Sequence, residues 1–398
     1  MRNLAKSRSL SALLSQLLVA YTVEIDNEFE LRMAREGFPG AGLSLTLWTN
    51  FLQFVPSEGI SFGDLAAISK SPREQLKFQL GCLERWGLVK FRYDGAATSA
   101  GAKRRGWGTK QGIGLDWFVL LTEKGKIAAE IWPPLWVEIE ERWKNRFGDN
   151  LSELASSLRK ITDQIETDLP AGLPFVFNEN EDESCVPKSS MKLADLQISS
   201  ILSQVLLTFA IQFNKRSRVP LVLCANVIRV LSDIAPVREG ELPRLTGSSQ
   251  ESSDIGWRLK PFVILESDPA KRGKLVRLSP RGKLAHEDYY RITSEIEKEW
   301  EKKFGGELRR SLEKLLQLKS EDKSLLAKGL VPPEGVARAG VLVPALGRRD
   351  VGAAAKKRMK DLADQTKRFI EDPENSLPHY PIWGSKPGLW AVIKNSKK

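Results

Sequence analysis

The chain has 398 residues, more than one typical core supports, so two domains are expected. Hydrophobic residues make up 41% and charged residues 28%, which provides enough apolar surface for a core and excludes global disorder. Lysine and arginine number 61 against 50 aspartate and glutamate residues, and the net charge of +11 favours a polyanionic partner.

The cysteines are scattered along the chain: Cys82, Cys185 and Cys224. An odd, scattered set does not form a disulfide framework, which indicates a reducing compartment, and we expect a cytoplasmic protein. The apolar run from Leu10 to Val23 is too short and too polar to span a bilayer. It also lacks a small-residue cleavage site, so neither a membrane partner nor a signal peptide is expected.

The first predicted element is a helix from Leu10 to Ile25, because its apolar residues recur at spacings of three and four. Part of it, Ser15–Val23, is echoed by Ser203–Ile211. Two further blocks recur in the same order: Leu121–Lys126 as Leu278–Lys283, and Ile139–Gly148 as Ile296–Gly305. Repeated blocks in one shared order indicate an internal duplication.

A helix-turn-helix is predicted in the first copy. Its first helix covers Ile60–Ser69, and its second, the recognition helix, covers residues 72–86. Ser71 fits the N-cap, and Glu74 completes a capping box. Gly87 fits the helix stop, so both ends of the recognition helix are defined by sequence.

The predicted recognition helix has two faces. Its apolar residues face the core: Leu76, Leu80 and Leu83. Its N-terminal half directs polar side chains wholly or partly outward: Arg73, Gln75, Lys77 and Gln79. In a helix that enters the major groove, arginine reads guanine, glutamine reads adenine, and lysine contacts a phosphate or a base. Together with Ser71, these residues are the expected DNA contacts, and an ordinary capped surface helix is the alternative interpretation.

Two strands and a basic loop are predicted next. The strands cover Leu88–Tyr93 and Leu115–Leu121. The loop between them supplies further candidate DNA contacts: Lys103, Arg104, Arg105 and Lys110. Strand, basic loop and strand after a recognition helix are the layout of a wing, whose basic residues neutralise phosphates or enter the minor groove. The alternative is a solvated loop in the free protein.

Each copy is predicted to close with one long amphipathic helix, Ile139–Ile161 in the first and Ile296–Leu315 in the second. Long apolar stripes need partners, so the helices of the two copies are expected to pack together as a bundle. Between the copies, prolines and acidic residues at 166–193 predict a linker on the surface.

The helix-turn-helix of the second copy is weaker. Its candidate first helix, Val237–Gly247, contains Pro243, which breaks the hydrogen-bond ladder near the end of that helix. The next segment, Ser248–Lys260, is short, and its acidic residues repel phosphates. The candidate DNA contacts of this copy are therefore in its wing: Lys271, Arg272 and Lys274. We expect the second copy to read DNA poorly or to read a different half-site.

Both copies resemble MarR-type winged-helix regulators. The first copy carries the resemblance in its helix-turn-helix, and the second carries it in Asp268–Gly282, which is similar to the family's Asp-Pro-x-Asp-Arg-Arg wing and Leu-Thr-x-x-Gly helix entry. Lys271 and Gly273 depart from that pattern. Members of the family are homodimers joined by terminal helices, so the resemblance implies that one chain supplies both halves as a monomeric pseudo-dimer. It also suggests a small aromatic effector, for which no residue here is specific.

The expected fold is therefore mainly α with small β wings, as two tandem winged helix-turn-helix units joined through a helical bundle. The units are residues 1–165 and 194–318, separated by the acidic linker and followed by a basic tail at 319–398. The resemblance does not extend to the tail. Its basic helix candidate, Gly352–Ile370, is expected to dock on the bundle, and phosphate contact is the alternative.

The expected function is sequence-specific binding of double-stranded DNA and regulation of transcription. No nucleophile with a base, pair of pocket carboxylates or phosphate-binding loop is visible, so no enzyme and no cofactor are expected. The glycine pairs at 106–108 and 112–114 precede a strand rather than open a helix, which argues against a nucleotide loop. Two histidines, His286 and His379, exclude most metal sites. The alternative function is a winged-helix protein-interaction scaffold with little DNA affinity.

Overall fold

The computed structural model describes residues 8–39, 41, 43–69, 73–93, 117–165, 169–170, 172–173, 197–247, 259–270, 273–333 and 363–381. These residues form long helices with small antiparallel sheets, so the predicted class, mainly α with small β elements, is confirmed. Within them, no helix is both long enough and apolar enough to cross a lipid bilayer.

The first half of the chain contains two long terminal helical regions that flank a small sheet. Its elements are α1 (Leu10–Arg35), α2 (Leu45–Asn50), η1 (Leu52–Phe54), β1 (Ile60–Ser61), α3 (Phe62–Ser69), α4 (Arg73–Arg85), β2 (Val89–Tyr93), β3 (Trp117–Leu121), α5 (Glu123–Phe147) and α6 (Asp149–Thr162). Strand β3 lies between β1 and β2, with Ile60 opposite Val119 and Val89 opposite Leu121. The two predicted strands are thus present within one or two residues of their expected bounds.

The second half has a similar order of elements in its described residues, which include no counterpart of α4. Its elements are α7 (Ile198–Arg216), α8 (Leu221–Asn226), η4 (Ile228–Val230), β4 (Val237–Arg238), η5 (Glu239–Glu241), α9 (Leu242–Thr246), η6 (Lys260–Phe262), β5 (Val263–Ser267), β6 (Lys274–Leu278), α11 (Pro280–Phe304) and α12 (Glu307–Gln317). Strand β6 lies between β4 and β5, with Val237 opposite Val276 and Val263 opposite Leu278. Strand order and register therefore agree between the halves.

The joint between the last strand and the next helix is also the same in both halves. Thr122 caps α5 by accepting a hydrogen bond from the N–H of Gly125, and Ser279 caps α11 by accepting one from Gly282. A Cβ on Gly125 would lie 2.0 Å from the carbonyl oxygen of Leu88. Glycine is required at this point because the helix start touches the backbone that precedes β2.

The closing helices differ from the sequence prediction, which placed one long helix in each copy. In the first half the helix is interrupted at Gly148, with φ of +54°, and α6 begins at the next residue. In the second half Gly305, with φ of +85°, separates α11 from α12. Apolar periodicity continues through both breaks, so the sequence pattern gave no sign that the helix ends there. The positive φ at each break is a backbone conformation that only a residue without a Cβ readily adopts.

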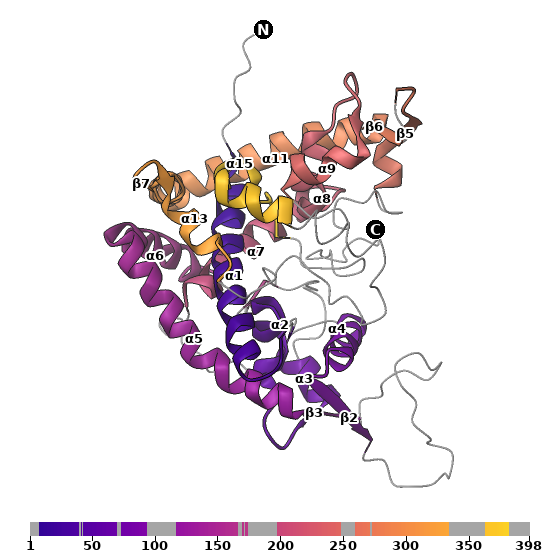
Figure 1. Ribbon diagram of the computed structural model, residues 1–398. Coiled ribbons are helices and arrows are strands. Elements are labelled where there is room, and N and C mark those ends of the chain that lie inside the picture. The colour runs from indigo at the N-terminus through magenta and orange to yellow at the C-terminus, as the bar shows by residue number, and fades with distance from the viewer. Residues whose placement is uncertain are drawn as a thin grey trace.

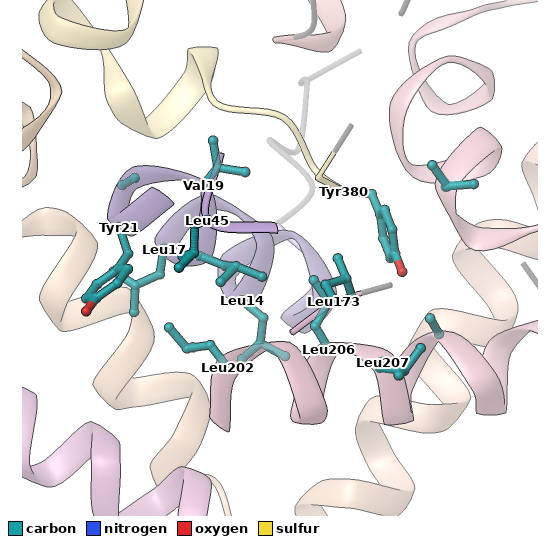
Figure 2. Close-up of a cluster of buried hydrophobic side chains, with 14 of the residues drawn as sticks. Leu14, Leu17, Val19, Tyr21, Leu45, Leu173, Leu202, Leu206, Leu207 and Tyr380 are labelled. Carbon is teal, nitrogen blue, oxygen red and sulfur yellow. The ribbon is translucent and has the colours of Figure 1, made fainter. Parts of the chain in front are cut away.

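Helix α1 lies at the centre of the molecule (Figure 1), and every residue from Leu10 to Glu30 is buried. It contacts α5 of its own half as well as α7 and α12 of the other half, while α6 packs on α12 and α7. Figure 2 shows Leu14 and Leu17 of α1 with Leu202 and Leu206 of α7 in one buried cluster. The expected packing of helices from both copies is therefore observed.

Equivalent aromatic contacts hold the two closing regions to the central helices. Trp143 of α5 meets Tyr21 of α1 with ring centroids 5.1 Å apart, and Trp300 of α11 meets Phe209 of α7 at 5.5 Å. The indole N–H of Trp143 donates to Glu24 and that of Trp300 to Gln212, each at 2.8 Å. The indole donors of Trp143 and Trp300 are thus satisfied in the same way.

Two further segments contribute to the core: the linker that joins the two halves, and the tail. The linker was expected on the surface, but its described residues are buried: Leu169, Pro170, Gly172 and Leu173. After α12 the chain forms a hairpin, β7 (Lys319–Ser320) and β8 (Lys323–Ser324), and then α13 (Leu325–Leu330), which packs on α1. A helix at residues 363–371 precedes α15 (Pro373–Ser376), and Phe369 is 2% exposed. Gln365 of this helix donates to the carbonyl of Gly247 at 3.1 Å, so this part of the tail is packed against the residue that follows α9, while residues 352–362 of the predicted helix lie outside the described residues.

Candidate nucleic-acid interface

The candidate interface begins at α3, which is shorter than the predicted helix Ile60–Ser69. Ile60 and Ser61 form strand β1 and pair with β3 instead. Ser61 then starts α3: its Oγ accepts from the N–H of Asp64 at 3.0 Å and lies 2.6 Å from the carboxylate of that residue. The buried side of α3 includes Phe62 and Leu65, both fully covered.

Helix α4 has the inward face that the sequence predicted, since Leu76, Leu80 and Leu83 are each 0% exposed. Arg73, its first residue, is exposed, and Lys77 one turn later is half-buried. Gln75 belongs to the first turn of the helix, and Ser71 lies outside the described residues. An exposed cation thus stands at the N-terminal end of a helix whose opposite side is anchored in the core.

Gln79 corrects the sequence prediction, which directed it outward. Its side chain is only 4% exposed. The position lies three residues after Leu76 and four before Leu83, so at 3.6 residues per turn it falls on the inward face of α4. Gln79 is therefore part of the packing of this helix and is not available to a base.

The C-terminal end of α4 is tied to α5. Gly87 takes a φ of +73°, and the ammonium of Lys124 donates to the carbonyl of Trp86 at 2.9 Å and to that of Ala41 at 3.2 Å. Burial lowers the pKa of Lys124, and the nearby carboxylate of Glu30 opposes that shift. This contact fixes the end of α4 relative to the helical body.

The hairpin of β2 and β3 carries basic residues that the sequence analysis did not select. Lys90 and Arg92 are exposed, and they alternate with the core-facing Val89 and half-buried Phe91. The guanidinium of Arg92 lies 5.3 Å from the ring centroid of Phe118 on the paired strand. The period of two along β2 was the signal that could have found them. The predicted loop residues lie outside the described part of the chain: Lys103, Arg104, Arg105 and Lys110.

The hairpin of the second half carries paired charges instead. Arg277 Nη2 lies 2.6 Å from Glu266, and Arg238 Nε lies 2.7 Å from Asp268, whose side chain is 4% exposed. Lys274 is exposed at the start of β6. Lys271 and Arg272 lie outside the described residues. Arg277 of this hairpin and Arg238 of the adjacent strand β4 are thus both neutralised by carboxylates of the hairpin.

The first helix of the second helix-turn-helix also differs from expectation. Val237 and Arg238 form strand β4, and α9 begins only at Leu242. Pro243 therefore sits in the first turn of α9, where no intrahelical N–H bond is lost, and it does not break the helix. Residues 248–258, which hold most of the expected second helix, lie outside the described residues.

Other reactive groups of the described residues are held in the core. Cys82 and Cys224 are buried, and burial raises the pKa of both thiols. Burial lowers the pKa of His379, and the cations of Arg229 and Arg8 lower it further. Within the described ranges, no group of three or more metal-ligating side chains occurs. Cys185 lies outside those ranges.

Comparison of the chain with family models, curated proteins and solved structures finds no match. The functional interpretation therefore depends on the geometry of α3, α4 and the two hairpins.

Proposed function

We propose that this protein binds double-stranded DNA in a sequence-specific manner and regulates transcription. In this proposal the two halves are winged helix-turn-helix units, arranged as a pseudo-dimer in one chain that resembles a MarR dimer. Helix α4 enters the major groove, and the basic residues of the β2–β3 hairpin contact the backbone.

One observation carries the proposal: α4 exposes Arg73 at its N-terminal end while its opposite side is fully anchored by Leu76, Leu80 and Leu83. Helix α4 also contacts β2, the strand that exposes Lys90 and Arg92. A rigid helix end and a basic hairpin on one unit supply the two kinds of contact that DNA recognition needs, base reading and phosphate neutralisation.

The proposed role of the second half is weaker binding. Carboxylates of its hairpin pair with Arg277 of β6 and with Arg238 of β4, so less positive charge is free to replace counterions on DNA. Lys274 remains exposed for one backbone contact. The second half then orients the first through the helical body and adds little affinity of its own.

The same paired charges favour a second candidate function, a protein-interaction scaffold with winged-helix architecture and little affinity for DNA. The two candidates differ in what they predict for duplex of random sequence. A DNA-binding protein binds this duplex at low salt, and its affinity falls steeply as the salt concentration rises. A scaffold does not bind the duplex at any salt concentration.

Selection of bound duplexes from a random pool tests the proposal. Enrichment of two half-sites about 10 base pairs apart, or a multiple of that spacing, supports DNA reading by both units. Enrichment of a single half-site supports reading by the first unit alone. Recovery of no motif by a folded protein would contradict sequence-specific binding.

A further inference from the structure

Two short Leu-Pro segments occupy equivalent places in the two halves. Strap 1, residues 169–170 and 172–173, follows α6, and strap 2, residues 377–381, follows α15. The sequence continues as Leu-Pro-Ala-Gly-Leu-Pro from Leu169 and as Leu-Pro-His-Tyr-Pro from Leu377. The side chains of Leu169, Leu173, Leu377 and Tyr380 are all buried. Figure 2 shows Leu173 and Tyr380 in the same cluster as the leucines of α1 and α7.

An asparagine at the end of a short helix binds the backbone of each strap. Asn50 ends α2 and donates from Nδ2 to the carbonyl of Leu173 at 3.0 Å. Asn226 ends α8, the matching helix, and donates to the carbonyl of Tyr380 at 3.0 Å. Its Oδ1 also accepts from the N–H of Tyr380 at 3.1 Å. Asn226 is 0% exposed, so its amide pairs with a peptide unit of strap 2 in the way that a neighbouring strand would.

A glutamine of the opposite half completes each attachment. Gln204 of α7 donates to the carbonyls of Leu169 and Pro170 at 3.5 Å. Gln16 of α1, which holds the same position in the repeated segment, donates to the carbonyls of Glu374 and Leu377 at 2.9 and 3.3 Å. Each strap therefore joins the asparagine of its own half to the glutamine of the other half.

We propose that each half of the protein carries a binding site for an extended Leu-Pro peptide, and that straps 1 and 2 are the occupants of these two sites. The site for strap 2 consists of Asn226, Gln16 and Ser15, whose hydroxyl donates to the carbonyl of Pro378 at 2.8 Å. These side chains bind carbonyls and one N–H of the peptide backbone. Specificity comes from the buried Leu377 and Tyr380, and the proline keeps the segment extended before it binds.

Because each strap is covalently attached, it fills its site at an effective concentration on the order of millimolar. A free peptide of the same chemistry, or a partner protein that presents such a segment, must displace the strap to bind. The strap 2 site is the one to test, since the side chain of Asn226 is hydrogen-bonded to both the main-chain N–H and the carbonyl of Tyr380.

The experiment uses the full chain with strap 2 weakened by Leu377→Ala and Tyr380→Ala, and a fluorescent synthetic peptide with the sequence of residues 374–382. Fluorescence anisotropy is expected to report binding at least about tenfold tighter than to the wild-type chain, whose site is filled. Adding Asn226→Ala to the weakened chain is expected to reduce binding by at least about tenfold. Adding Asn375→Ala, whose amide bonds to Asp372 within its own segment, leaves binding unchanged.

The proposal is overturned if the folded, weakened chain does not bind the peptide, binds a scrambled peptide equally well, or binds it equally with Asn226→Ala. Hydrogen exchange of full-length single variants gives a second readout should the weakened chain fail to fold. Exchange at the Tyr380 amide is expected to rise in Asn226→Ala and in Gln16→Ala but not in Asn375→Ala. Equal exchange in all of these variants overturns the proposal. Neither readout involves DNA, so failure of the peptide-site proposal can be distinguished from failure of the proposed DNA-binding function.

Discussion

Arg92 and Glu266 occupy the same register position in the two sheets. Arg92 lies opposite Phe118 in the pairing of β2 with β3, and Glu266 lies opposite Leu275 in the pairing of β5 with β6. The same backbone thus presents a cation in one half and an anion, paired with Arg277, in the other. This difference in charge gives the first prediction.

Glu266→Arg is expected to increase affinity for random-sequence duplex, because it adds a cation and releases Arg277 from its ion pair. The slope of log affinity against log salt is expected to steepen by about 1 to 2. Stability changes by less than about 1 kcal/mol, since the pair is half exposed. Glu141→Arg, an equal charge change at an exposed position on α5, serves as the control. Equal gains in the two variants would contradict a DNA-facing hairpin.

Gln79→Ala is expected to reduce the free energy of unfolding by about 1 to 3 kcal/mol, because the side chain is buried in the packing of α4. Gln79→Met retains most of the volume and is expected to recover much of that loss. Urea unfolding measures both variants. For the folded fraction of each variant, the slope of log affinity for duplex against log salt is expected to equal that of the wild type. A lower slope with unchanged stability would instead indicate that Gln79 contacts DNA.

Gly125→Ala is expected to be strongly destabilising, by several kcal/mol, because its Cβ would lie 2.0 Å from the carbonyl oxygen of Leu88. Gly282→Ala should behave in the same way, with the new Cβ 1.9 Å from the carbonyl oxygen of Phe262. Gly240→Ala is the matched control, since nothing lies within 4 Å of its added Cβ. Thermal unfolding checks the three variants, and a similar midpoint for all of them would contradict the close approach.

Asp26→Asn is expected to stabilise the protein relative to the wild type, and this gain in the free energy of unfolding is expected to increase as pH rises. Burial raises the pKa of Asp26 well above its ordinary value, and the carboxylate of Glu30 adds to that shift, while the N–H of Leu45 opposes it. A raised pKa means that protonation of Asp26 stabilises the folded state. That contribution is complete below the ordinary pKa of aspartate and is lost as pH rises through the raised value.

Urea unfolding between about pH 5 and about pH 8 tests this, and the advantage of Asp26→Asn over the wild type is expected to grow with pH. Asp163→Asn changes an exposed carboxylate and is expected to follow the wild-type curve. An advantage of Asp26→Asn that shrinks as pH rises would contradict the raised pKa.

Periodicity was sufficient to predict much of the first half. The inward face of α4, both strands of its hairpin and the start of α1 at Leu10 follow from local spacing, whereas the burial of α1 on all sides does not. The failures have a common cause. The break at Gly148, the burial of strap 1 and the role of Pro243 each depend on what another segment of the chain supplies, which spacing alone does not encode. Gln79 is different, since its spacing of three residues from Leu76 and four from Leu83 places it on the inward face by helical geometry alone.

The most direct test of the central claim is equilibrium binding of the full chain to a random-sequence duplex over a range of salt concentrations. The account predicts binding at about 50 mM salt and a linear fall of log affinity with log salt. Arg92→Ala is expected to lower that slope by about 1, while Arg218→Ala, an exposed control beyond α7, leaves it unchanged. A folded wild-type chain that does not bind duplex at low salt, or a slope unaffected by Arg92→Ala, would contradict the account.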